Sequence, residues 1–283
     1  MPTSADLFVS ASWLNAHLDD EDIQLVDARM LPVGDETRDI YAEYRAAHLP
    51  DAVFFDIERL SEQQTSLPHM MPDAATFARA LSQLGLSEHR HLIIYDEGNL
   101  FSAPRAWWML TLAGAQRVSL LSGGLAGWKQ QGFPLQQGDV ALPSATFQVQ
   151  PYPHGAIRSQ DEVLAVSQNG NEQIVDARAA ARFFGQTDEP REGLRRGHIP
   201  GSFNVPWNVL VADGALKPNH ELATLFEQAG VDIQRPIIAS CGSGVTASVV
   251  ILALYALNAP SVSLYDGSWS EWGARHDLPI ATA

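Results

Sequence analysis

The chain has 283 residues, of which 46% are hydrophobic and 18% are charged, and its formal net charge is −15. Because a domain typically has about 100–200 residues, this length predicts one large domain or two ordinary ones, and the apolar content excludes intrinsic disorder. The acidic balance argues against nucleic-acid binding through the overall field, so an anionic ligand would need a local positive site.

The cysteine count and the apolar stretches bear on the compartment. The chain has one cysteine, so no disulfide can form within it, which is typical of a reducing environment. Residues 1–10 lack the basic start and apolar core of a signal peptide. The longest strongly apolar stretch, residues 249–257, is shorter than the ~20 residues of a membrane span. We expect a cytoplasmic protein that does not associate with membranes.

The first half alternates buried strands with a helix. Residues 23–26 and 92–95 are short, mainly apolar runs, which predict buried strands. Between them, apolar side chains recur at helical spacing over residues 77–84, and Gly85 follows as a stop signal. Strands of this kind, separated by helices, predict a parallel sheet covered on both faces.

The second half predicts the same order of elements. Strands are expected at residues 174–175 and 237–240, and helices at residues 222–229 and 247–257. The sequence itself also repeats, since QLVDAR at residues 24–29 returns as QIVDAR at 173–178. Further matches follow in the same order. Two homologous α/β domains in tandem are the simplest explanation.

The boundary between the halves is predicted near residues 136–156. This stretch is rich in Gln, Gly, Ser and Pro and has no helical period. We therefore expect a first domain over residues 1–140 and a second over residues 156–283.

The duplication separates scaffold from function. A feature that occurs in both halves, such as the Asp-Ala-Arg motif or the pair His48 and His198, is expected to be structural. Cys241 has no cysteine partner, because its counterpart in the first half is about Glu97, and Arg182 has no arginine counterpart. These two unpaired residues are the first candidates for a functional site.

Cys241 is predicted to lie on a tight turn between a strand and a helix. It is followed by Gly242, Ser243, Gly244, Val245 and Thr246 before the predicted helix begins. The glycines let successive backbone N–H groups point inward, and a helix N-terminus carries partial positive charge. Both features favour a thiolate nucleophile. A buried structural cysteine is the alternative.

Two further observations narrow the chemistry. Phosphatases with a cysteine nucleophile need an arginine directly after five intervening residues, in a Cys-x5-Arg loop. Here Ala247 stands at the position of that arginine, which disfavours phosphate-ester hydrolysis. Five arginines lie between Arg178 and Arg196, in a chain with only two lysines. This cluster is either an anion-binding segment or a salt-bridged loop.

The loop at Cys241 resembles the active-site loop of the 3-mercaptopyruvate sulfurtransferases, a branch of the rhodanese superfamily. The resemblance covers nearly the whole chain. Its other motifs are YDEG at residues 95–98, SAPR at 102–105, GHIPG at 197–201 and YDGSW at 265–269. It implies two tandem rhodanese-like domains, a non-catalytic first and a catalytic second, with no metal and no organic cofactor.

The resemblance also implies roles for particular residues. Cys241 would carry sulfur as a persulfide, which the backbone N–H groups of residues 242–246 would hold. Arg182 and Arg191 would bind the donor carboxylate. A proton relay would consist of Ser243, His69 and Glu58, and Glu58 stands where members of the branch often have Asp.

The donor and the acceptor are implied as well. Thiosulfate-specific members have basic residues just after the cysteine, whereas Gly242 and Ser243 are neutral, which favours 3-mercaptopyruvate. The acceptor would be cyanide or a thiol, such as thioredoxin or a small thiol. A thiosulfate sulfurtransferase and a non-enzymatic sulfur-carrier module remain as alternatives.

Overall fold

The computed structural model describes residues 7–35 and 37–282. These form two compact units. The first comprises residues 1–63, 71–153 and 212–215, and the second comprises residues 64–70, 154–211 and 216–283, as far as they are described. Two short pieces of chain therefore group with the unit of the opposite half.

Each unit contains a five-stranded sheet in which every pairing is parallel. The first sheet has the order β1 (Phe8–Val9), β5 (Arg117–Leu121), β4 (His91–Tyr95), β2 (Ile23–Asp27) and β3 (Val53–Phe54). The second has the order β6 (Ile157–Arg158), β12 (Val262–Tyr265), β11 (Ile237–Ser240), β7 (Gln173–Asp176) and β8 (Phe203–Asn204). The two orders are equivalent, so the predicted duplication and α/β fold class are confirmed.

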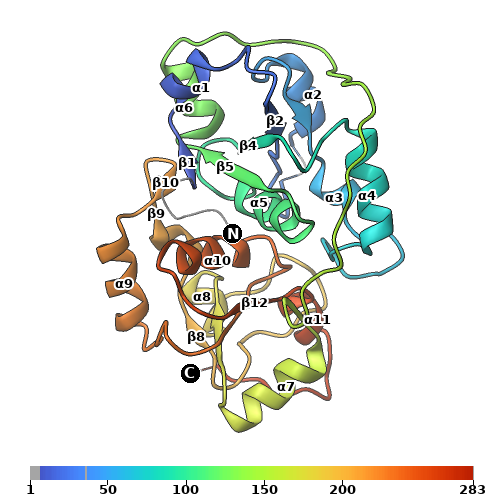
Figure 1. Cartoon of the computed structure of the whole chain (residues 1–283). Coiled ribbons are helices and arrows are strands. Elements are labelled where there is room, and N and C mark those ends of the chain that lie inside the picture. The colour runs from blue at the N-terminus through green and yellow to red at the C-terminus, as the bar shows by residue number, and fades with distance from the viewer. Residues whose placement is uncertain (1–6, 36, 283) are drawn as a thin grey trace. The chain divides into compact units, whose positions relative to one another are not determined.

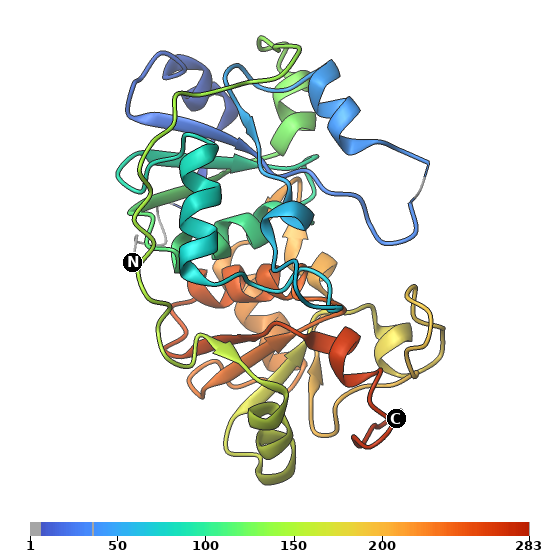
Figure 2. The same cartoon turned by 90° about the vertical axis from the view of Figure 1, so that its right-hand side faces the viewer.

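Helices lie on both sides of each sheet (Figures 1 and 2). The first unit has α1 (Ala11–Ala16), α2 (Ile40–Ala46), α3 (Ile57–Leu60), α4 (Ala74–Gln83), α5 (Ala103–Leu112) and α6 (Gly124–Gln130). The second has α7 (Gln160–Asn169), α8 (Ala180–Phe183), the 3-10 helix η2 (Trp207–Leu210), α9 (Asn219–Gln228), α10 (Ala247–Ala256) and α11 (Ser268–Trp272). A short hairpin of β9 (Val211–Ala212) and β10 (Ala215–Leu216) follows η2.

The two hydrophobic cores are built alike. In the first unit, side chains of α1 and α6 pack on one face of the central strands, with Trp128 fully buried among them. In the second, α7 and α11 do the same around Trp269 and Trp272. The opposite faces are covered by α5 and α10, which contact the central strands of their sheets. Helix α10 is buried on nearly every side, which explains its continuous apolar sequence.

The Asp-Ala-Arg motifs have the structural role predicted for them. In each unit the arginine turns back onto the aspartate two residues earlier, as Arg29 does with Asp27 and Arg178 with Asp176. Each arginine also donates to a backbone carbonyl just before the paired histidine. All four side chains are almost fully buried. Because a buried arginine needs several partners, these pairs hold the ends of β2 and β7 in place.

None of the helices in the described part of the chain combines the length and the hydropathy needed to cross a bilayer.

Candidate functional site

The strand registers identify the residue that corresponds to Cys241 in the first unit. Asp27 lies opposite Tyr95 in the first sheet, and its counterpart Asp176 lies opposite Ser240 in the second. Tyr95 and Ser240 are therefore equivalent, and the residue after Tyr95 is Asp96. The sequence comparison pointed to Glu97 and was wrong by one residue, because the connection from strand to helix is one residue longer in the first unit (96–102 against 241–246).

In the first unit, the side chain of Asp96 binds the backbone amides of this loop. Its carboxylate accepts backbone N–H groups from Gly98 at 2.9 Å and from Ser102 and Ala103 at 3.1 Å, and the side chain is buried. Ala103 is the first residue of α5. The loop and the helix N-terminus of the first unit thus form a ring of amide donors around a negative charge.

Cys241 stands in the equivalent loop of the second unit, and its backbone is fixed on both sides. Its N–H donates to Ser268 Oγ at 3.1 Å, and its carbonyl accepts from Trp269 N at 3.0 Å. The carbonyl of Gly242 accepts from Ser270 N at 2.9 Å and from Ser270 Oγ at 2.7 Å. The first turn of α11 therefore sets the position of the loop.

The amides of this loop lack the acceptor that Asp96 supplies in the first unit. Within the described chain, the backbone N–H groups of Gly242, Ser243, Val245 and Thr246 donate to no protein acceptor. A sulfur anion on Cys241 would supply the missing negative charge. That these amides hold a persulfide stays a prediction.

The thiol of Cys241 is less accessible than a turn position suggests. The residue is only 1% exposed. Burial alone is typical of a structural cysteine. In addition, amides without an acceptor follow it in the loop, and a guanidinium described below lies beside Gly242. The exclusion of bulk water also strengthens any interaction between a sulfur anion and these dipoles.

Ser243 and His69 meet in the second unit. His69 Nδ1 lies 2.9 Å from Ser243 Oγ and 3.3 Å from the Ser243 carbonyl oxygen, and both residues are buried. His69 belongs to residues 64–70, which group with the second unit, and it has φ +60°. Such a backbone conformation is strained for a side chain larger than glycine and is often found at functional sites.

Glu58 belongs to the first unit. It is in the first turn of α3 in the first unit, with an exposed side chain, and its backbone carbonyl accepts from Gln63 Nε2 at 2.8 Å. Its place in a relay with His69 stays a prediction.

Arg182 lies beside the cysteine loop. It is in the last turn of α8, and a Cβ atom added at Gly242 would lie 3.2 Å from its Nη2. The side chain is 27% exposed. One guanidinium of the arginine cluster is thus next to the residue that follows the thiol.

Sequence reasoning missed Glu189, which holds this arginine. The Glu189 carboxylate accepts from Arg178 Nη1 at 2.8 Å through Oε1, and from Arg182 Nε at 3.1 Å and Nη2 through Oε2. Its side chain is only 1% exposed. The sequence signal was a carboxylate embedded in the arginine cluster. The reading of that segment as a salt-bridged loop is therefore correct in part.

Arg178 forms the buried base of this cluster. Burial opposes its charge, but Asp176 and Glu189 outweigh that effect and hold the pKa of Arg178 above its usual value. Its guanidinium carbon also lies 4.2 Å from the centre of the Trp269 ring. Since Trp269 N–H binds the Cys241 carbonyl, Arg178 connects the arginine cluster with the cysteine loop.

Arg191 follows Glu189 after one proline and is half-buried. The proline restricts the backbone of Glu189 to extended conformations, which limits where Glu189 and Arg191 can point. That Arg191 binds a donor stays a prediction.

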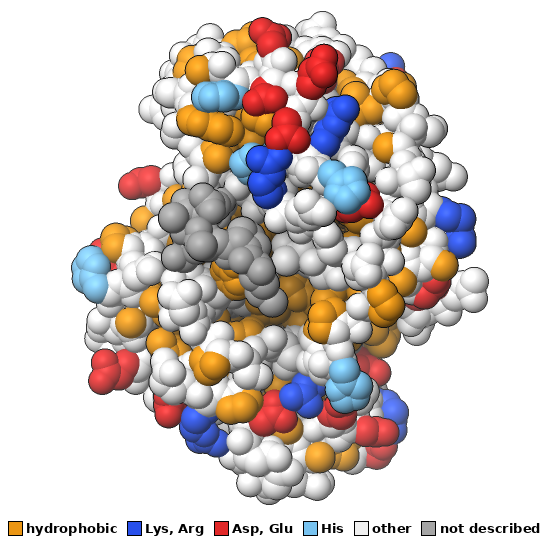
Figure 3. All heavy atoms as spheres, viewed as in Figure 1, with side chains coloured by type: hydrophobic (Ala, Val, Ile, Leu, Met, Phe, Trp, Pro, Cys, Tyr) orange, Lys and Arg blue, Asp and Glu red, His pale blue; other side chains and the backbone are white. Residues whose placement is uncertain are grey.

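The charged side chains on the face drawn in Figure 3 are mixed in sign. Figure 3 shows acidic and basic side chains interspersed over one face, without a broad basic patch among the described residues drawn there. Among the described residues, no group of His, Cys, Asp and Glu side chains could hold a metal ion.

Comparison with known proteins agrees with this geometry. The model of the rhodanese-like domain matches residues 10–131 and again residues 159–275. The chain is 54% identical over 277 residues to the 3-mercaptopyruvate sulfurtransferase of Escherichia coli K12, covering 98% of each chain. It is 37% identical to the mitochondrial thiosulfate/3-mercaptopyruvate sulfurtransferase 1 of Arabidopsis thaliana, covering 98% of this chain and 79% of the relative.

A solved structure shows the same fold over nearly the whole length. The crystal structure of SseA from Escherichia coli, a 3-mercaptopyruvate sulfotransferase, superposes with a TM-score of 0.86 at 53% identity, covering 93% of this chain and 99% of the other. The same domain model thus matches the chain twice, once in each of two units that have equivalent sheet topology. The chain belongs to the rhodanese family and contains two tandem rhodanese-like domains.

Proposed function

We propose that this protein is a 3-mercaptopyruvate sulfurtransferase that carries sulfur as a persulfide on Cys241. The observation that carries the proposal is the loop after Cys241, in which four amides lack an acceptor where the first unit holds the Asp96 carboxylate. The relatives with this activity support it.

The first half-reaction transfers sulfur to the enzyme. The Cys241 thiolate attacks the sulfur of 3-mercaptopyruvate, and a new S–S bond forms as the C–S bond breaks. The electron pair of the C–S bond leaves on carbon as the enolate of pyruvate, which takes up a proton to give pyruvate. Ser243 would deliver that proton, supported by its contact with His69 at 2.9 Å, and Glu58 would complete the relay.

The second half-reaction returns the thiolate. An acceptor thiolate attacks the outer sulfur of the persulfide, takes it away as a new persulfide, and leaves Cys241 as its thiolate. Gly242, Gly244, Val245 and Thr246 lie in the loop whose amides would stabilise the anionic sulfur in both states. We propose thioredoxin, a small thiol or cyanide as the acceptor, and a reducing cytoplasm as the place, in keeping with the single cysteine.

Arg182 and Arg191 would bind the donor carboxylate. A guanidinium binds a planar carboxylate through two parallel N–H groups, which a lysine cannot do. The neutral side chains at Gly242 and Ser243 favour a donor with one carboxylate over the doubly charged thiosulfate. Thiosulfate stays a second candidate donor, because the Arabidopsis relative is named for both compounds.

Mass spectrometry of the intact protein tests the proposal. Incubation with 3-mercaptopyruvate should add one sulfur atom to the protein and release one equivalent of pyruvate. A thiol added afterwards should remove the sulfur. Cys241→Ser should do neither. Sulfur transfer by Cys241→Ser at the rate of the unmodified protein would refute the assignment, and faster loading from thiosulfate would reverse the donor preference.

A further inference from the structure

Glu189 has no role in the chemistry proposed above, yet it is one of the least exposed carboxylates in the second unit. Its two oxygens are divided between Arg178 and Arg182. Arg178 is fully buried and already bound to Asp176, whereas Arg182 is 27% exposed and lies beside Gly242. Arg178 therefore anchors the Glu189 carboxylate, and the anchored carboxylate can in turn hold the partly exposed side chain of Arg182 in place.

The geometry of Arg182 suits this role. Its Nε and Nη2 atoms donate to Glu189 Oε2, which engages one edge of the planar guanidinium. Within the described residues, Nη1 donates no hydrogen bond to the protein. The edge made by Nη1 and Nη2 is therefore available for a second carboxylate, in the plane that the first one sets.

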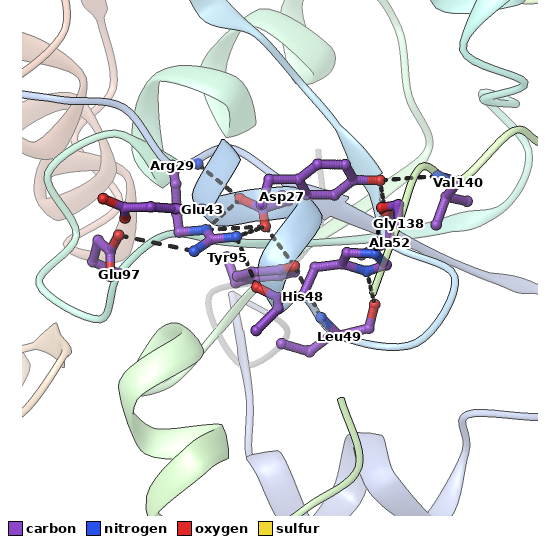
Figure 4. A network of polar contacts seen from close by, with 12 residues as sticks. Asp27, Arg29, Glu43, His48, Leu49, Ala52, Tyr95, Glu97, Gly138 and Val140 are labelled. Atoms are coloured by element: carbon purple, nitrogen blue, oxygen red, sulfur yellow. Dashed lines mark hydrogen bonds and ion pairs between the residues drawn. The ribbon is translucent and has the colours of Figure 1, made fainter. Parts of the chain in front are cut away.

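The first unit offers a comparison within the same molecule. Figure 4 shows the guanidinium of Arg29, the counterpart of Arg178, between the carboxylates of Asp27 and Glu97. Glu97 lies 4.0 Å from Arg29 and its side chain is 38% exposed, whereas Glu189 lies 2.8 Å from Arg178 and is 1% exposed. The tightly held carboxylate thus occurs in the unit with the cysteine.

We propose that Glu189 is a positioning residue that orients Arg182 toward the carboxylate of the sulfur donor and so makes the enzyme select donors that have one. The proposal rests on the proposed function. Glu189 touches no reacting atom. It fixes the plane of a long side chain that would otherwise sample many rotamers, and its negative charge balances Arg182 while the donor is absent.

A matched pair of donors tests this selection. 3-Mercaptopyruvate has a carboxylate, and mercaptoacetone is a similar mercaptoketone without one, which would release acetone after sulfur transfer. In Glu189→Gln, the negative charge is lost, and an amide nitrogen in place of Oε2 accepts from neither Nε nor Nη2 of Arg182. The KM for 3-mercaptopyruvate should therefore rise about 10-fold or more. The kcat for that donor, and the rate of persulfide formation from mercaptoacetone, should change less than 2-fold.

A control and a double-mutant cycle separate positioning from stability. Glu97→Gln removes the corresponding carboxylate near Arg29 and should leave both donors unaffected. In an Arg182→Met background, Glu189→Gln should add no further rise in KM for 3-mercaptopyruvate, because Glu189 acts through Arg182. If Glu189→Gln does not fold, Glu189→Asp keeps the charge for Arg178 with a shorter reach to Arg182, and KM alone should rise about 3-fold or more.

The outcomes are distinct. If the unmodified protein forms no persulfide from 3-mercaptopyruvate, the proposed function fails. If it does form the persulfide, any of three results would show that Glu189 does not position Arg182. The KM for 3-mercaptopyruvate is unchanged in the Glu189 variants, or the activities with the two donors fall equally, or the rise in KM adds to that caused by Arg182→Met. A loss in Glu97→Gln as large as that in Glu189→Gln overturns the proposal in the same way.

Discussion

Asp96 in the first unit and Cys241 in the second occupy the same place, directly after the equivalent strands β4 and β11. The carboxylate of Asp96 accepts three backbone N–H groups, whereas the corresponding loop at Cys241 has amides without an acceptor. In the first unit, a side chain of the protein thus accepts the hydrogen bonds of the loop amides. In the second unit, the corresponding amides are available for an anionic sulfur on Cys241.

The Asp96 carboxylate should stabilise the first unit strongly. Asp96→Ala leaves two buried N–H groups and one partly buried N–H group without an acceptor, and we expect the free energy of unfolding to fall by about 2–4 kcal/mol in urea titrations. Asp73→Ala is the matched control, because Asp73 caps the exposed start of α4 through Ala75 N and Thr76 N, and its loss should reduce the free energy of unfolding much less. An equal decrease in the free energy of unfolding in both variants would show that the amide ring around Asp96 stabilises the protein no more than an ordinary helix cap does.

The same reasoning predicts that a carboxylate is tolerated at the position of the thiol. Cys241→Asp should be inactive but more stable than the isosteric Cys241→Asn by about 1–2 kcal/mol near neutral pH, because only the aspartate supplies a negative charge to the loop amides. Amide donors lower a carboxylate's pKa, so this extra stability should be present above pH ~4 and be lost as the pH falls and the carboxylate is protonated. Urea titrations of both variants across this range measure the difference. A Cys241→Asn protein that is the more stable of the two would contradict an anion-binding loop.

The sequence was sufficient for the fold but only partly for the site. The repeated motifs and apolar runs report local patterns, and these determine strands, helices and the duplication. The extra residue in the loop after Tyr95 changes no pattern, so only the strand registers could identify Asp96 rather than Glu97 as the counterpart of Cys241. The bridge from Glu189 to two arginines likewise depends on how residues 178–191 turn back on themselves. No local pattern encodes such a turn.

The close approach of Arg182 to Gly242 predicts that adding one methyl group at Gly242 weakens donor binding. The backbone of Gly242 is not left-handed, so alanine fits the chain there, but its Cβ would lie 3.2 Å from Arg182 Nη2. Gly242→Ala should therefore displace the guanidinium and raise KM for 3-mercaptopyruvate about 3–10-fold. Persulfide formation from mercaptoacetone should change little. Steady-state kinetics with both donors measure the effect, and an unchanged KM would mean that Arg182 does not bind the donor in this orientation.

The contact between Ser243 and His69 predicts a defect in proton transfer rather than in binding. The Ser243 hydroxyl lies 2.9 Å from His69 Nδ1, so Ser243→Ala removes the group that would pass a proton to the departing enolate. General acid catalysis typically contributes about 100-fold or more, and we expect kcat for pyruvate release to fall by about that factor with KM little changed. Ser248→Ala is a suitable control, because Ser248 is also buried and donates only to the Gly244 carbonyl at 3.2 Å. A Ser243→Ala protein with an unchanged kcat but a raised KM would instead assign the hydroxyl to donor binding and remove it from the proton relay.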